Sequence, residues 1–425
     1  MKAYMEVYGC SANVADYEIM AGLLRKSGFQ IVRKQKDSDI NIIVTCIVKS
    51  PTEQRMIHKI KKLQRDSKPL IIAGCMPKAE RELVEYITPQ ASLLGPNSIQ
   101  KIVDVVKTTL KNERTVFLRD LREPKICLPR IRKNPIIGIV PIAEGCAWRK
   151  CTYCILKFAR GKLFSYPIDL IIKEIKQSLR EGCREFWITG QDTSAYGLDR
   201  GTDLAELLKE ICEIEGKFFL RIGMMNPIHV PNILNKLVKI YQNEKIFNFL
   251  HLPVQSGDND VLKRMNRSYS VEAFKRIVFS FRKKIPEITI ATDVICGFPG
   301  EREEAFERSM KLIEEIKPDV LNISRFFPRP KTQAKNMKQL PIRKVKERSK
   351  EMTALFKRLC NERNRAWLDW KGEIFVDEKG KDNSWIGRNF AYKPVVVKSN
   401  RFLLGKFMDV RVRKVFPTYL EAEKE

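Results

Sequence analysis

Short apolar runs and amphipathic stretches alternate regularly along the central part of the chain. The apolar runs cover residues 136–142, 185–189, 218–223, 247–253, 289–295 and 320–326. Between them, apolar positions recur at the spacing of a helix with one buried face, over residues 168–180, 204–213, 231–241, 271–284 and 303–316. Successive strand–helix units of this kind predict an α/β fold, a partial (β/α)6 barrel, whose chemistry lies at the C-terminal ends of the strands.

The residues that follow these predicted strands are polar at nearly every turn. They are Cys146, Gln191, Asp192, Asn226, Gln255, Ser256, Asp293 and Arg325. A single polar residue at such a place is often a helix cap or a turn residue. Because polar residues recur at strand after strand, a shared site is the better interpretation.

A shorter alternation occupies residues 1–118 and predicts a small α/β domain with a parallel sheet. Its β-rich runs are 4–7, 40–44 and 70–73, and its helical patterns are 15–27, 51–67 and 79–86. The three runs lead into Cys10, Cys46 and Cys75. The carboxyl ends of parallel strands meet at one edge of a sheet, so we expect these cysteines to converge on one ligand. A role as small core residues would not predict the same strand-end position three times.

Basic residues concentrate in three places outside these patterns. Residues 119–134 form a basic connector. Residues 343–365 form a long helical pattern with nine basic and three acidic residues, which indicates either a solvated helix face or a phosphate contact. From residue 371 on, β-rich runs at 373–376, 392–397 and 407–415 predict a small β-barrel. A basic surface suited to RNA would come from Lys398, Arg401, Lys406, Arg411, Arg413 and Lys414.

The overall charge agrees with a polyanionic partner. The 425 residues include 79 Lys and Arg against 51 Asp and Glu, a net charge of +28 that would attract phosphates. Adaptation to high temperature or to a salty cytosol is the alternative. No apolar run is long enough to span a bilayer, and no apolar leader follows the first methionine. We therefore expect a cytoplasmic protein with no membrane partner, monomeric by default.

The stretch GCAWRKCTYC places three cysteines close together: Cys146, Cys151 and Cys154. In a reducing compartment, metal-binding or catalytic thiols are a better interpretation of the 11 cysteines than disulfides. A structural zinc site needs four ligands, and none of the three histidines lies near Cys146 in the sequence. A [4Fe–4S] cluster with three cysteine ligands instead leaves one iron open. The pattern therefore indicates a cluster whose open iron binds a substrate or cofactor.

Three cysteines just after the first strand of a partial barrel resemble the radical S-adenosylmethionine superfamily. There, S-adenosylmethionine chelates the open iron and is cleaved to a 5′-deoxyadenosyl radical. The usual spacing is C-x3-C-x2-C, whereas Cys146 and Cys151 enclose four residues. We expect the extra residue to bulge outward at Trp148 and Arg149 without moving the thiolates.

Further motifs over nearly the whole chain are similar to the methylthiotransferases of that superfamily. In the amino-terminal domain they are YGCSANVADYEIM, VTCIVKSPTEQ and AGCMPKA. In the barrel they are CTYCILKFARGKLFSYP, WITGQDTSAYG, RIGMMNP, FLHLPVQSGDNDVLKRMNRSY, TDVICGFPGE and FFPRPKTQA. The last segment resembles a TRAM domain, an RNA-binding β-barrel, through GEIFVDEKG, WIGRNFAYKPVVV, LLGKFMDVRV and PTYL. The chain looks most like the archaeal and eukaryotic branch that acts on threonylcarbamoyladenosine. It departs from the family at Lys331, where glycine is common.

The resemblance implies three domains: a methylthiotransferase domain at 1–118, a radical domain at 132–360 and a TRAM domain at 366–425. It implies one [4Fe–4S] cluster, which generates the radical, on Cys146, Cys151 and Cys154, and an auxiliary [4Fe–4S] cluster on Cys10, Cys46 and Cys75. Contacts to S-adenosylmethionine or substrate are expected from Tyr153, Gln191, Asp192, Gln255, Asp293 and Arg325. The remaining cysteines are expected to be packing residues: Cys127, Cys183, Cys212, Cys296 and Cys360.

By the same resemblance, the reaction adds a methylthio group to carbon 2 of N6-threonylcarbamoyladenosine in the anticodon loop of tRNA. An electron donor protein would supply the reducing equivalents. Rival targets for the same chemistry are isopentenyladenosine in tRNA and an aspartate of a ribosomal protein. A function of another class is an RNA-binding protein whose iron–sulfur clusters are not catalytic.

Overall fold

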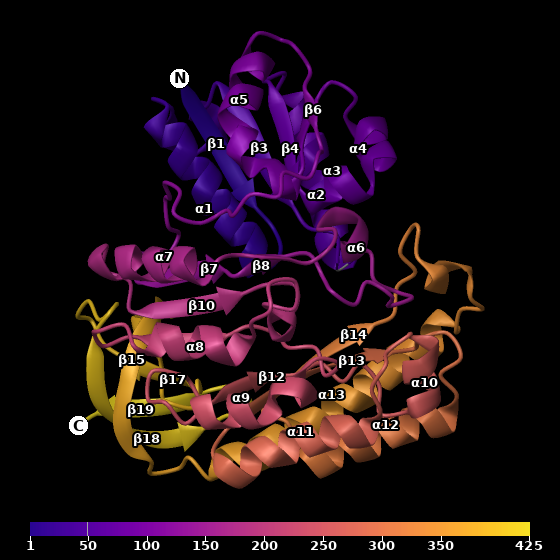
Figure 1. Cartoon of the computed structure of the whole chain (residues 1–425), viewed down its shortest axis with the longest axis vertical. Helices are drawn as coiled ribbons and strands as arrows, with labels where there is room; N and C mark the ends of the chain where they lie inside the picture. Colours follow the sequence, from indigo (N-terminus) through magenta and orange to yellow (C-terminus); the bar gives the residue numbers. More distant parts are fainter. Residues whose placement is uncertain (49) are drawn as a thin grey trace.

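The chain folds into three parts, which correspond to three successive stretches of the sequence. The computed structural model describes residues 1–48 and 50–425, without the side chains of residues 50–52. Figure 1 shows an amino-terminal α/β part at the top, a partial barrel below it, and a small β-barrel against the side of the partial barrel. Lys49, within the motif VTCIVKSPTEQ, lies outside the described residues.

The amino-terminal part contains a parallel sheet with the strand order β2-β1-β3-β4-β5-β6. Its strands are β1 (Lys2–Val7), β2 (Gln30–Val32), β3 (Ile40–Thr45), β4 (Leu70–Gly74), β5 (Ser92–Leu94) and β6 (Val116–Phe117). The central strands β3 and β4 are buried along their whole length, as the unbroken apolar runs INIIVT and LIIAG require. The apolar pattern predicts β1, β3 and β4, and misses the short β2, β5 and β6.

Helices cover both faces of this sheet. They are α1 (Ser11–Lys26), α2 (Ser50–Arg65), α3 (Cys75–Ala79), α4 (Arg81–Ile87) and α5 (Ile102–Leu110). Apolar residues of α1 and α5 pack on one face, and those of α2, α3 and α4 pack on the other. The helices after β1, β3 and β4 all begin at the same edge of the sheet, because the strands are parallel and adjacent.

The central part confirms the predicted partial barrel. Its parallel strands are β7 (Ile137–Pro141), β10 (Glu185–Thr189), β11 (Phe219–Ile222), β12 (Phe249–His251), β13 (Thr289–Cys296) and β14 (Val320–Arg325). A parallel bridge between Leu220 and Ile246 joins the β7–β10–β11 half to the β12–β13–β14 half. All these strands were predicted, because each is an apolar run bounded by polar residues.

Helices form the outer layer of the partial barrel. They are α7 (Ile168–Arg180), α8 (Leu204–Cys212), α9 (Leu234–Ile240), α10 (Asn259–Arg264), α11 (Val271–Lys284) and α12 (Glu303–Ile316). The sequence pattern misses α10, a short helix capped by Asp258, whose carboxylate accepts the Val261 N–H at 2.8 Å. Between β7 and α7 lie the paired strands β8 (Ala143–Glu144) and β9 (Phe164–Ser165) and the short α6 (Leu156–Ala159).

The C-terminal part is a closed barrel with the strand order β15-β16-β17-β19-β18. Its strands are β15 (Lys371–Lys379), β16 (Ser384–Arg388), β17 (Pro394–Lys398), β18 (Phe407–Val415) and β19 (Leu420–Lys424). The predicted small β-barrel is thus confirmed, with β16 and β19 added. In β19, buried Leu420 and Ala422 alternate with more exposed neighbours. The sequence does not predict this strand, because it consists mainly of glutamate and alanine, which are depleted in strands.

The C-terminal barrel packs against the N-terminal ends of the partial-barrel strands. The Tyr392 hydroxyl donates to Glu185, the first residue of β10, at 3.1 Å, and the Tyr392 ring contacts Phe249, the first residue of β12. The guanidinium of Arg221 lies over the rings of Trp187, Phe249 and Tyr392, at 5.1–5.5 Å from their centroids. This arrangement leaves the C-terminal strand ends, where the polar residues lie, facing the other way.

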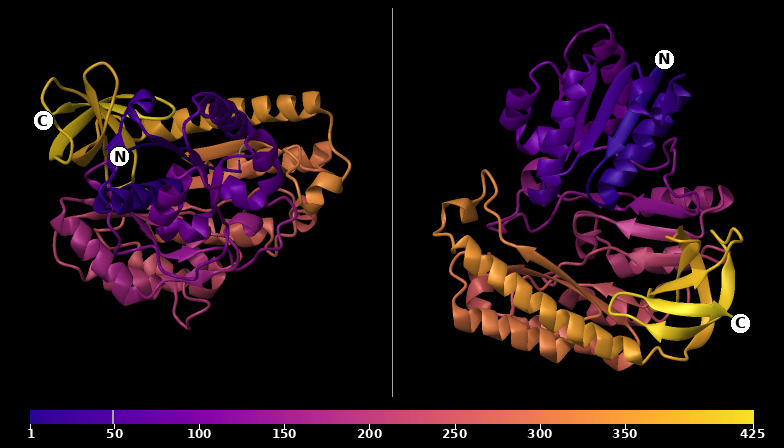
Figure 2. Two further views of the ribbon diagram at one scale, coloured as in Figure 1. Left: turned by 90° about the horizontal axis from the view of Figure 1, so that it is seen from above. Right: turned by 180° about the vertical axis from the view of Figure 1, so that it is seen from behind.

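The long helix α13 (Ile342–Arg365) runs along the outside of the partial barrel toward the C-terminal barrel (Figure 2). Five of its nine basic residues form ion pairs with acidic residues: Arg343, Lys344, Arg348, Arg358 and Arg363. The helix is therefore mainly a packing element with a salt-bridged face, rather than a continuous phosphate-binding surface. Among the described residues, no helix combines the length and apolar character that crossing a membrane requires.

Candidate active site

The amino-terminal cysteines lie together at the carboxyl edge of the sheet, as the sequence predicts. Cys10 directly precedes α1, Cys46 follows β3, and Cys75 begins α3. A Cβ built on Gly9 would lie 3.1 Å from Cys46 Sγ, so the chain before Cys10 is pressed against Cys46. Cys46 and Cys75 are buried, whereas Cys10 is exposed. We call these residues the first triad.

Burial raises the pKa of two thiols of the first triad, Cys75 and Cys46. Burial raises the pKa of the Cys75 thiol to about 12, and the Arg160 guanidinium opposes this rise while Cys10 and Cys46 add to it. Burial also raises the pKa of Cys46, against backbone hydrogen bonds from Val48 and Ile47. In this environment a thiolate needs a cationic ligand to be stable, as a metal-bound sulfur has.

The second triad consists of Cys146, Cys151 and Cys154, in the loop after β8. Burial raises the pKa of Cys146, and the backbone N–H groups of Arg149 and Trp148 oppose the rise. Burial raises the pKa of Cys154 to about 11, with a further contribution from Cys151 and a smaller one from Cys146. The three sulfurs thus share one small region, as in the first triad.

The loop between Cys146 and Cys151 turns at Arg149. Arg149 has a left-handed backbone with φ +47°, which allows the chain to turn between the first two cysteines. The turn is held in place, since Trp148 Nε1 donates to the Asn266 carbonyl at 2.7 Å and Lys150 Nζ lies 5.1 Å from the Trp148 ring centroid. The following Thr152 donates its backbone N–H to the Met265 carbonyl at 3.1 Å. The cysteine loop is therefore tied to the α10–α11 connection.

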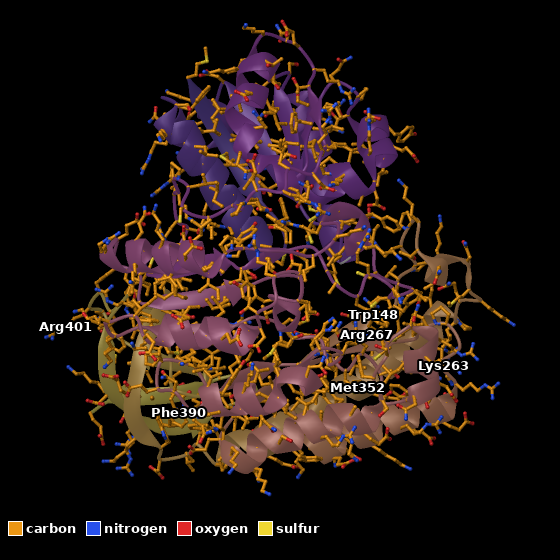
Figure 3. All side chains as sticks on the ribbon, viewed as in Figure 1. Trp148, Lys263, Arg267, Met352, Phe390 and Arg401 are labelled. Atoms are coloured by element: carbon orange, nitrogen blue, oxygen red, sulfur yellow. The ribbon has the colours of Figure 1, made fainter. Side chains whose placement is uncertain are left out.

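Arg267, from that same connection, contacts the second triad directly. Its Nη1 lies 3.3 Å from Cys151 Sγ, its Nη2 donates to Asn226 Oδ1 at 2.9 Å, and its Nε donates to the Tyr269 hydroxyl at 3.1 Å. Figure 3 labels Arg267 beside Trp148. Arg267 lies within the motif FLHLPVQSGDNDVLKRMNRSY, but no local pattern identifies it as a site residue.

Gln191 and Asp192, the two polar residues after β10, form hydrogen bonds within the protein. Gln191 Oε1 accepts the Gly145 N–H at 2.5 Å, next to Cys146. Asp192 is 2% exposed, and its Oδ1 accepts the Ser194 hydroxyl at 2.6 Å and the Asn226 N–H at 2.9 Å. Its Oδ2 is buried and has no hydrogen-bond partner among the described residues. Asp192 therefore uses Oδ1 for hydrogen bonds within the chain, whereas Oδ2 forms no hydrogen bond among the described residues and lies 3.8 Å from His229 Nε2.

The other four predicted contact residues lie at three places. Asp293 Oδ2 lies 3.2 Å from His251 Nε2, and the Gln255 backbone N–H donates to the Asp293 carbonyl at 2.8 Å, so Gln255 and Asp293 are neighbours. Arg325 is exposed at the end of β14. Tyr153 packs edge-on against Phe298 with a centroid distance of 6.2 Å. The strand ends thus bring Gln191, Asp192, Gln255 and Asp293 to the same side of the partial barrel as the second triad.

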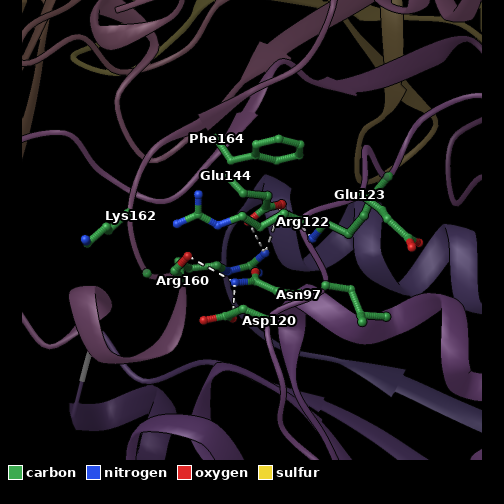
Figure 4. Close-up of a pocket in the computed structure, with 11 residues that line it drawn as sticks. Asn97, Asp120, Arg122, Glu123, Glu144, Arg160, Lys162 and Phe164 are labelled. Carbon is green, nitrogen blue, oxygen red and sulfur yellow. Dashed lines mark hydrogen bonds and ion pairs between the residues drawn. The ribbon is translucent and has the colours of Figure 1, made fainter. Parts of the chain in front are cut away.

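A buried charge network lies between the two triads. Lys125 Nζ is 2.6 Å from both Asp16 Oδ1 and Glu144 Oε1, and Arg160 reaches Asp16 Oδ2 at 2.8 Å and Glu144 Oε2 at 3.1 Å. All four side chains are at most 8% exposed. Burial would raise the pKa of Glu144, but Lys125 and Arg160 hold it below its ordinary value. Figure 4 shows Arg160 and Glu144 beside a small cavity of about 30 Å³.

Further contacts lock the amino-terminal part onto the partial barrel. Ile47, Cys75 and Ala79 share an apolar cluster with Ile155 and Ala159, which follow the second triad. Arg329, in the motif FFPRPKTQA, donates to the Ile47 carbonyl at 2.5 Å and pairs with Glu53. The two triads therefore belong to one continuous interface, although they come from different domains.

The donor set of each triad, three thiols, has the chemistry of a [4Fe–4S] cluster with one open iron. Among the described residues, no three His, Cys, Asp or Glu side chains are close enough together to bind one metal ion. A [4Fe–4S] cluster makes a different demand, because each cysteine binds a different iron and the sulfurs stand farther apart. Each triad supplies three thiols at one edge, which leaves the fourth iron of such a cluster free for another ligand.

Replacing Gly145 by alanine is expected to weaken iron binding by the second triad. Gly145 has φ +77°, and a Cβ there would lie 2.1 Å from the Lys162 carbonyl oxygen, so the cysteine loop must move. We expect Gly145→Ala to lower the iron content after anaerobic reconstitution by about four atoms per chain, relative to the wild type. Gly182→Ala is the control, because Gly182 also has a positive φ (+101°) but its Cβ would meet nothing within 4 Å. Equal iron loss in both variants would contradict the role of the Lys162 contact.

Family models match all three parts of the chain. Residues 2–95 match Uncharacterized protein family UPF0004, residues 140–313 match the Radical SAM superfamily, and residues 372–424 match the TRAM domain. Among solved structures, the radical S-adenosylmethionine methyltransferase TsrM from Kitasatospora setae has a TM-score of 0.55 at 14% identity. That match covers 76% of this chain and 72% of that chain. The cobalamin-dependent S-adenosylmethionine radical enzyme OxsB has a TM-score of 0.56 at 13% identity, over 82% of this chain and 56% of that one. At these identities the likeness concerns the fold alone.

Curated relatives match this chain over nearly its whole length. A protein of Pyrococcus horikoshii named "Probable threonylcarbamoyladenosine tRNA methylthiotransferase" is 41% identical over 100% of this chain and 99% of its own length. A protein of Methanothermobacter thermautotrophicus with the same name is also 41% identical, over 100% and 99%. The human protein named "Threonylcarbamoyladenosine tRNA methylthiotransferase" is 39% identical over 97% of this chain and 72% of its own length.

Proposed function

Because the chain belongs to the threonylcarbamoyladenosine tRNA methylthiotransferase family, we propose that it adds a methylthio group to carbon 2 of threonylcarbamoyladenosine in the anticodon loop of tRNA. One observation carries the proposal beyond family membership. Two separate cysteine triads, each one thiol short of a complete [4Fe–4S] ligand set, lie on one interface between two domains. An enzyme that only generated a radical would need one such triad.

We assign the first triad to an auxiliary [4Fe–4S] cluster and the second to the cluster that binds S-adenosylmethionine. When bound, this cofactor supplies a 5′-deoxyadenosyl radical, which the unactivated C–H bond of adenine carbon 2 requires, because it offers no proton to a base. Asp192 Oδ2, buried and without a hydrogen-bond partner among the described residues, is our candidate for the cofactor's amino group. We expect Gln255, Asp293, Tyr153 and Arg325 to complete the contacts to cofactor or substrate.

The proposal extends to the partners of the enzyme. We expect tRNA to bind across the C-terminal barrel and the open strand ends, and a donor protein to reduce the clusters. We expect the enzyme to act as a monomer in the cytoplasm. Asn13 and Arg160, which connect the cysteine loops, would hold the auxiliary site in place during turnover.

Mass spectrometry of tRNA nucleosides tests the proposed reaction. Cells that lack this protein should contain threonylcarbamoyladenosine without the methylthio group, and the wild-type gene should restore the modified form. An unchanged nucleoside profile would contradict the proposed target. The same samples would then be examined for methylthiolated isopentenyladenosine and for modified aspartate in ribosomal proteins. If no product forms and the reduced protein yields no 5′-deoxyadenosine, a non-catalytic RNA-binding protein is the better interpretation.

Three of the six basic residues predicted for the surface of the C-terminal barrel lie close to acidic residues. Arg411 pairs with Asp369, Arg413 pairs with Glu423, and Lys414 lies 3.8 Å from Glu421. The other three predicted basic residues are exposed and form no ion pair among the described residues: Lys398, Arg401 and Lys406. Figure 3 shows Arg401 at the outer edge of this barrel, and the adjacent Phe402 is 66% exposed. A cation beside an exposed ring is typical of RNA-binding surfaces.

Removing two of these free cations is expected to reduce the salt dependence of tRNA binding. Each lost phosphate contact should lower the slope of log K against log salt by about 0.7, so Lys398→Gln with Arg401→Gln should lower it by about 1.4. Filter binding or fluorescence anisotropy over a range of salt concentrations measures this slope. The matched control is Arg413→Gln, because Arg413 is already paired with Glu423 at 2.9 Å. A slope that falls equally in the control would contradict our assignment of the phosphate contacts.

A further inference from the structure

Each cysteine triad is contacted by an arginine from another element: Arg160, which is 2% exposed, and Arg267, which is partly buried. The proposed function gives Arg160 only a structural role and gives Arg267 none. Arg160 Nε donates toward Cys75 Sγ at 3.4 Å, and Arg267 Nη1 donates toward Cys151 Sγ at 3.3 Å. Building on the proposed function, we propose that Arg160 and Arg267 are positioning residues that set the reduction potentials of the auxiliary and radical-generating clusters separately, each through one hydrogen bond to a cysteine sulfur.

The direction of the Arg160 hydrogen bond is fixed by its other contacts. Its Nη2 donates to Asn13 Oδ1 at 2.7 Å and to Asp16 Oδ2 at 2.8 Å, and its Nη1 donates to Glu144 Oε2 at 3.1 Å. The terminal nitrogens of the guanidinium are therefore occupied by oxygen acceptors, and Nε is left to face the sulfur. Asn13 is itself held, because its Nδ2 donates to the Tyr8 and Thr45 carbonyls at 2.8 and 3.0 Å.

The charges around Arg160 balance without a contribution from a cluster. Two acidic side chains, Asp16 and Glu144, face two basic ones, Lys125 and Arg160, in one buried network. Such a network keeps Arg160 charged and in place whether or not the sulfur beside it carries extra negative charge. Arg160 can therefore act on the cluster electrostatically without moving when the cluster changes its redox state.

Arg267 is fixed in a comparable way beside the other triad. Asn226 and the Tyr269 hydroxyl accept from two of its nitrogens, and its guanidinium lies 5.0 Å from the Tyr269 ring centroid. Tyr269 is anchored in turn, because its hydroxyl donates to the Val254 carbonyl at 2.8 Å. The remaining nitrogen, Nη1, faces Cys151.

A cationic N–H donor beside a cluster sulfur favours reduction. An added electron places negative charge partly on the sulfurs, so the hydrogen bond and the positive charge stabilise the reduced cluster more than the oxidised one. Arg160 is 2% exposed and Arg267 is partly buried, and their low exposure to water strengthens the effect. In the sequence, Arg160 lies at the end of α6, shortly after the second triad. In space, it contacts Cys75 of the first triad, which belongs to the amino-terminal domain. The auxiliary potential therefore depends on the docking of the two domains.

The test measures each cluster by itself in the full-length chain. A variant with Cys146, Cys151 and Cys154 changed to alanine retains only the auxiliary cluster, and one with Cys10, Cys46 and Cys75 changed to alanine retains only the other. Redox titration followed by electron paramagnetic resonance gives each midpoint potential. We expect Arg160→Gln to shift only the auxiliary potential, and Arg267→Gln only the radical-cluster potential. Both shifts should be negative and near tenfold in the reduction equilibrium, about 59 mV for one electron.

A control variant and a charge-preserving variant define the outcomes. Lys162→Gln removes an exposed charge two residues from Arg160 and should leave both potentials unchanged. Arg160→Lys keeps the charge that balances Asp16 and Glu144, so it should fold even if Arg160→Gln does not, and it should still lower the auxiliary potential. Unchanged potentials in Arg160→Lys and Arg267→Gln, or equal shifts of both clusters in either variant, would overturn the inference. If the auxiliary-only chain binds no iron while Arg160 is intact, the two-cluster function itself fails instead.

Discussion

Cys151→Ala is expected to abolish both cleavage of S-adenosylmethionine and methylthiolation of tRNA. Cys151 is 7% exposed, its sulfur accepts from Arg267, and it supplies one of only three thiols in the second triad. A cluster left with two thiolates, beside a partly buried Arg267 that has lost its sulfur partner, is not stable. The reconstituted variant should contain about four iron atoms per chain instead of about eight. Iron and sulfide analysis, together with chromatography of 5′-deoxyadenosine, measures the loss.

The matched control for Cys151→Ala is Cys212→Ala. Cys212 is half-buried on α8 and belongs to neither triad, so its replacement should leave iron content and product formation near wild type. Retention of 5′-deoxyadenosine formation by Cys151→Ala would show that this loop does not hold the radical-generating cluster. The unusual four-residue spacing between Cys146 and Cys151 would then have to belong to a different site.

Cys75→Ala is expected to separate the two halves of the reaction. Cys75 is buried in the first triad and shares Arg160 with the network between the triads, whereas the second triad keeps all three of its thiols. The variant should therefore still cleave S-adenosylmethionine to 5′-deoxyadenosine, but should form no methylthiolated tRNA. Activity should fall below detection for the transfer and by less than about tenfold for the cleavage, because the Cys151 environment is unchanged. Both products can be measured in one anaerobic assay.

Cys296→Ala serves as the control for Cys75→Ala. Cys296 is completely buried at the end of β13 and distant in sequence from both triads, so it reproduces the loss of a buried sulfur without the loss of a cluster ligand. The two-cluster assignment would be contradicted if Cys75→Ala methylthiolated tRNA at the wild-type rate. Loss of cleavage together with transfer in Cys75→Ala, but not in Cys296→Ala, would mean that the first triad is needed to assemble the second site.

Local patterns account for the parts of the fold that the sequence predicts well. Every strand of the partial barrel is an apolar run between polar residues, and the predicted bounds of α7, α11 and α12 agree with the structure. Short strands such as β2 and β6 were missed because two or three residues do not establish a periodicity. Their existence depends on pairing with β1 and β5, which is a long-range contact.

In the candidate site, too, the residues marked by local sequence patterns were predictable, and those placed by long-range contacts were not. The cysteines were predictable because strand ends and thiol spacing are visible in the sequence. Arg160 and Arg267 were not, because they reach cysteines 85 and 116 residues away along the chain. The cofactor contact expected of Asp192 stays a prediction. Only Oδ2 could make it, because Oδ1 already accepts from Ser194 and Asn226.

By itself, the sequence determined the partial barrel, the parallel amino-terminal sheet, both cysteine triads and the family resemblance. These follow from repeating patterns of apolar residues and from motifs in which the informative residues are close together. Only the tertiary structure decided which charges meet. With 79 basic and 51 acidic residues, the sequence offers no local signal that Lys125 pairs with Asp16, 109 residues away, or that Arg160 reaches both Asp16 and Cys75. Ion pairs between domains depend on how buried surfaces dock, and docking is a property of the whole fold.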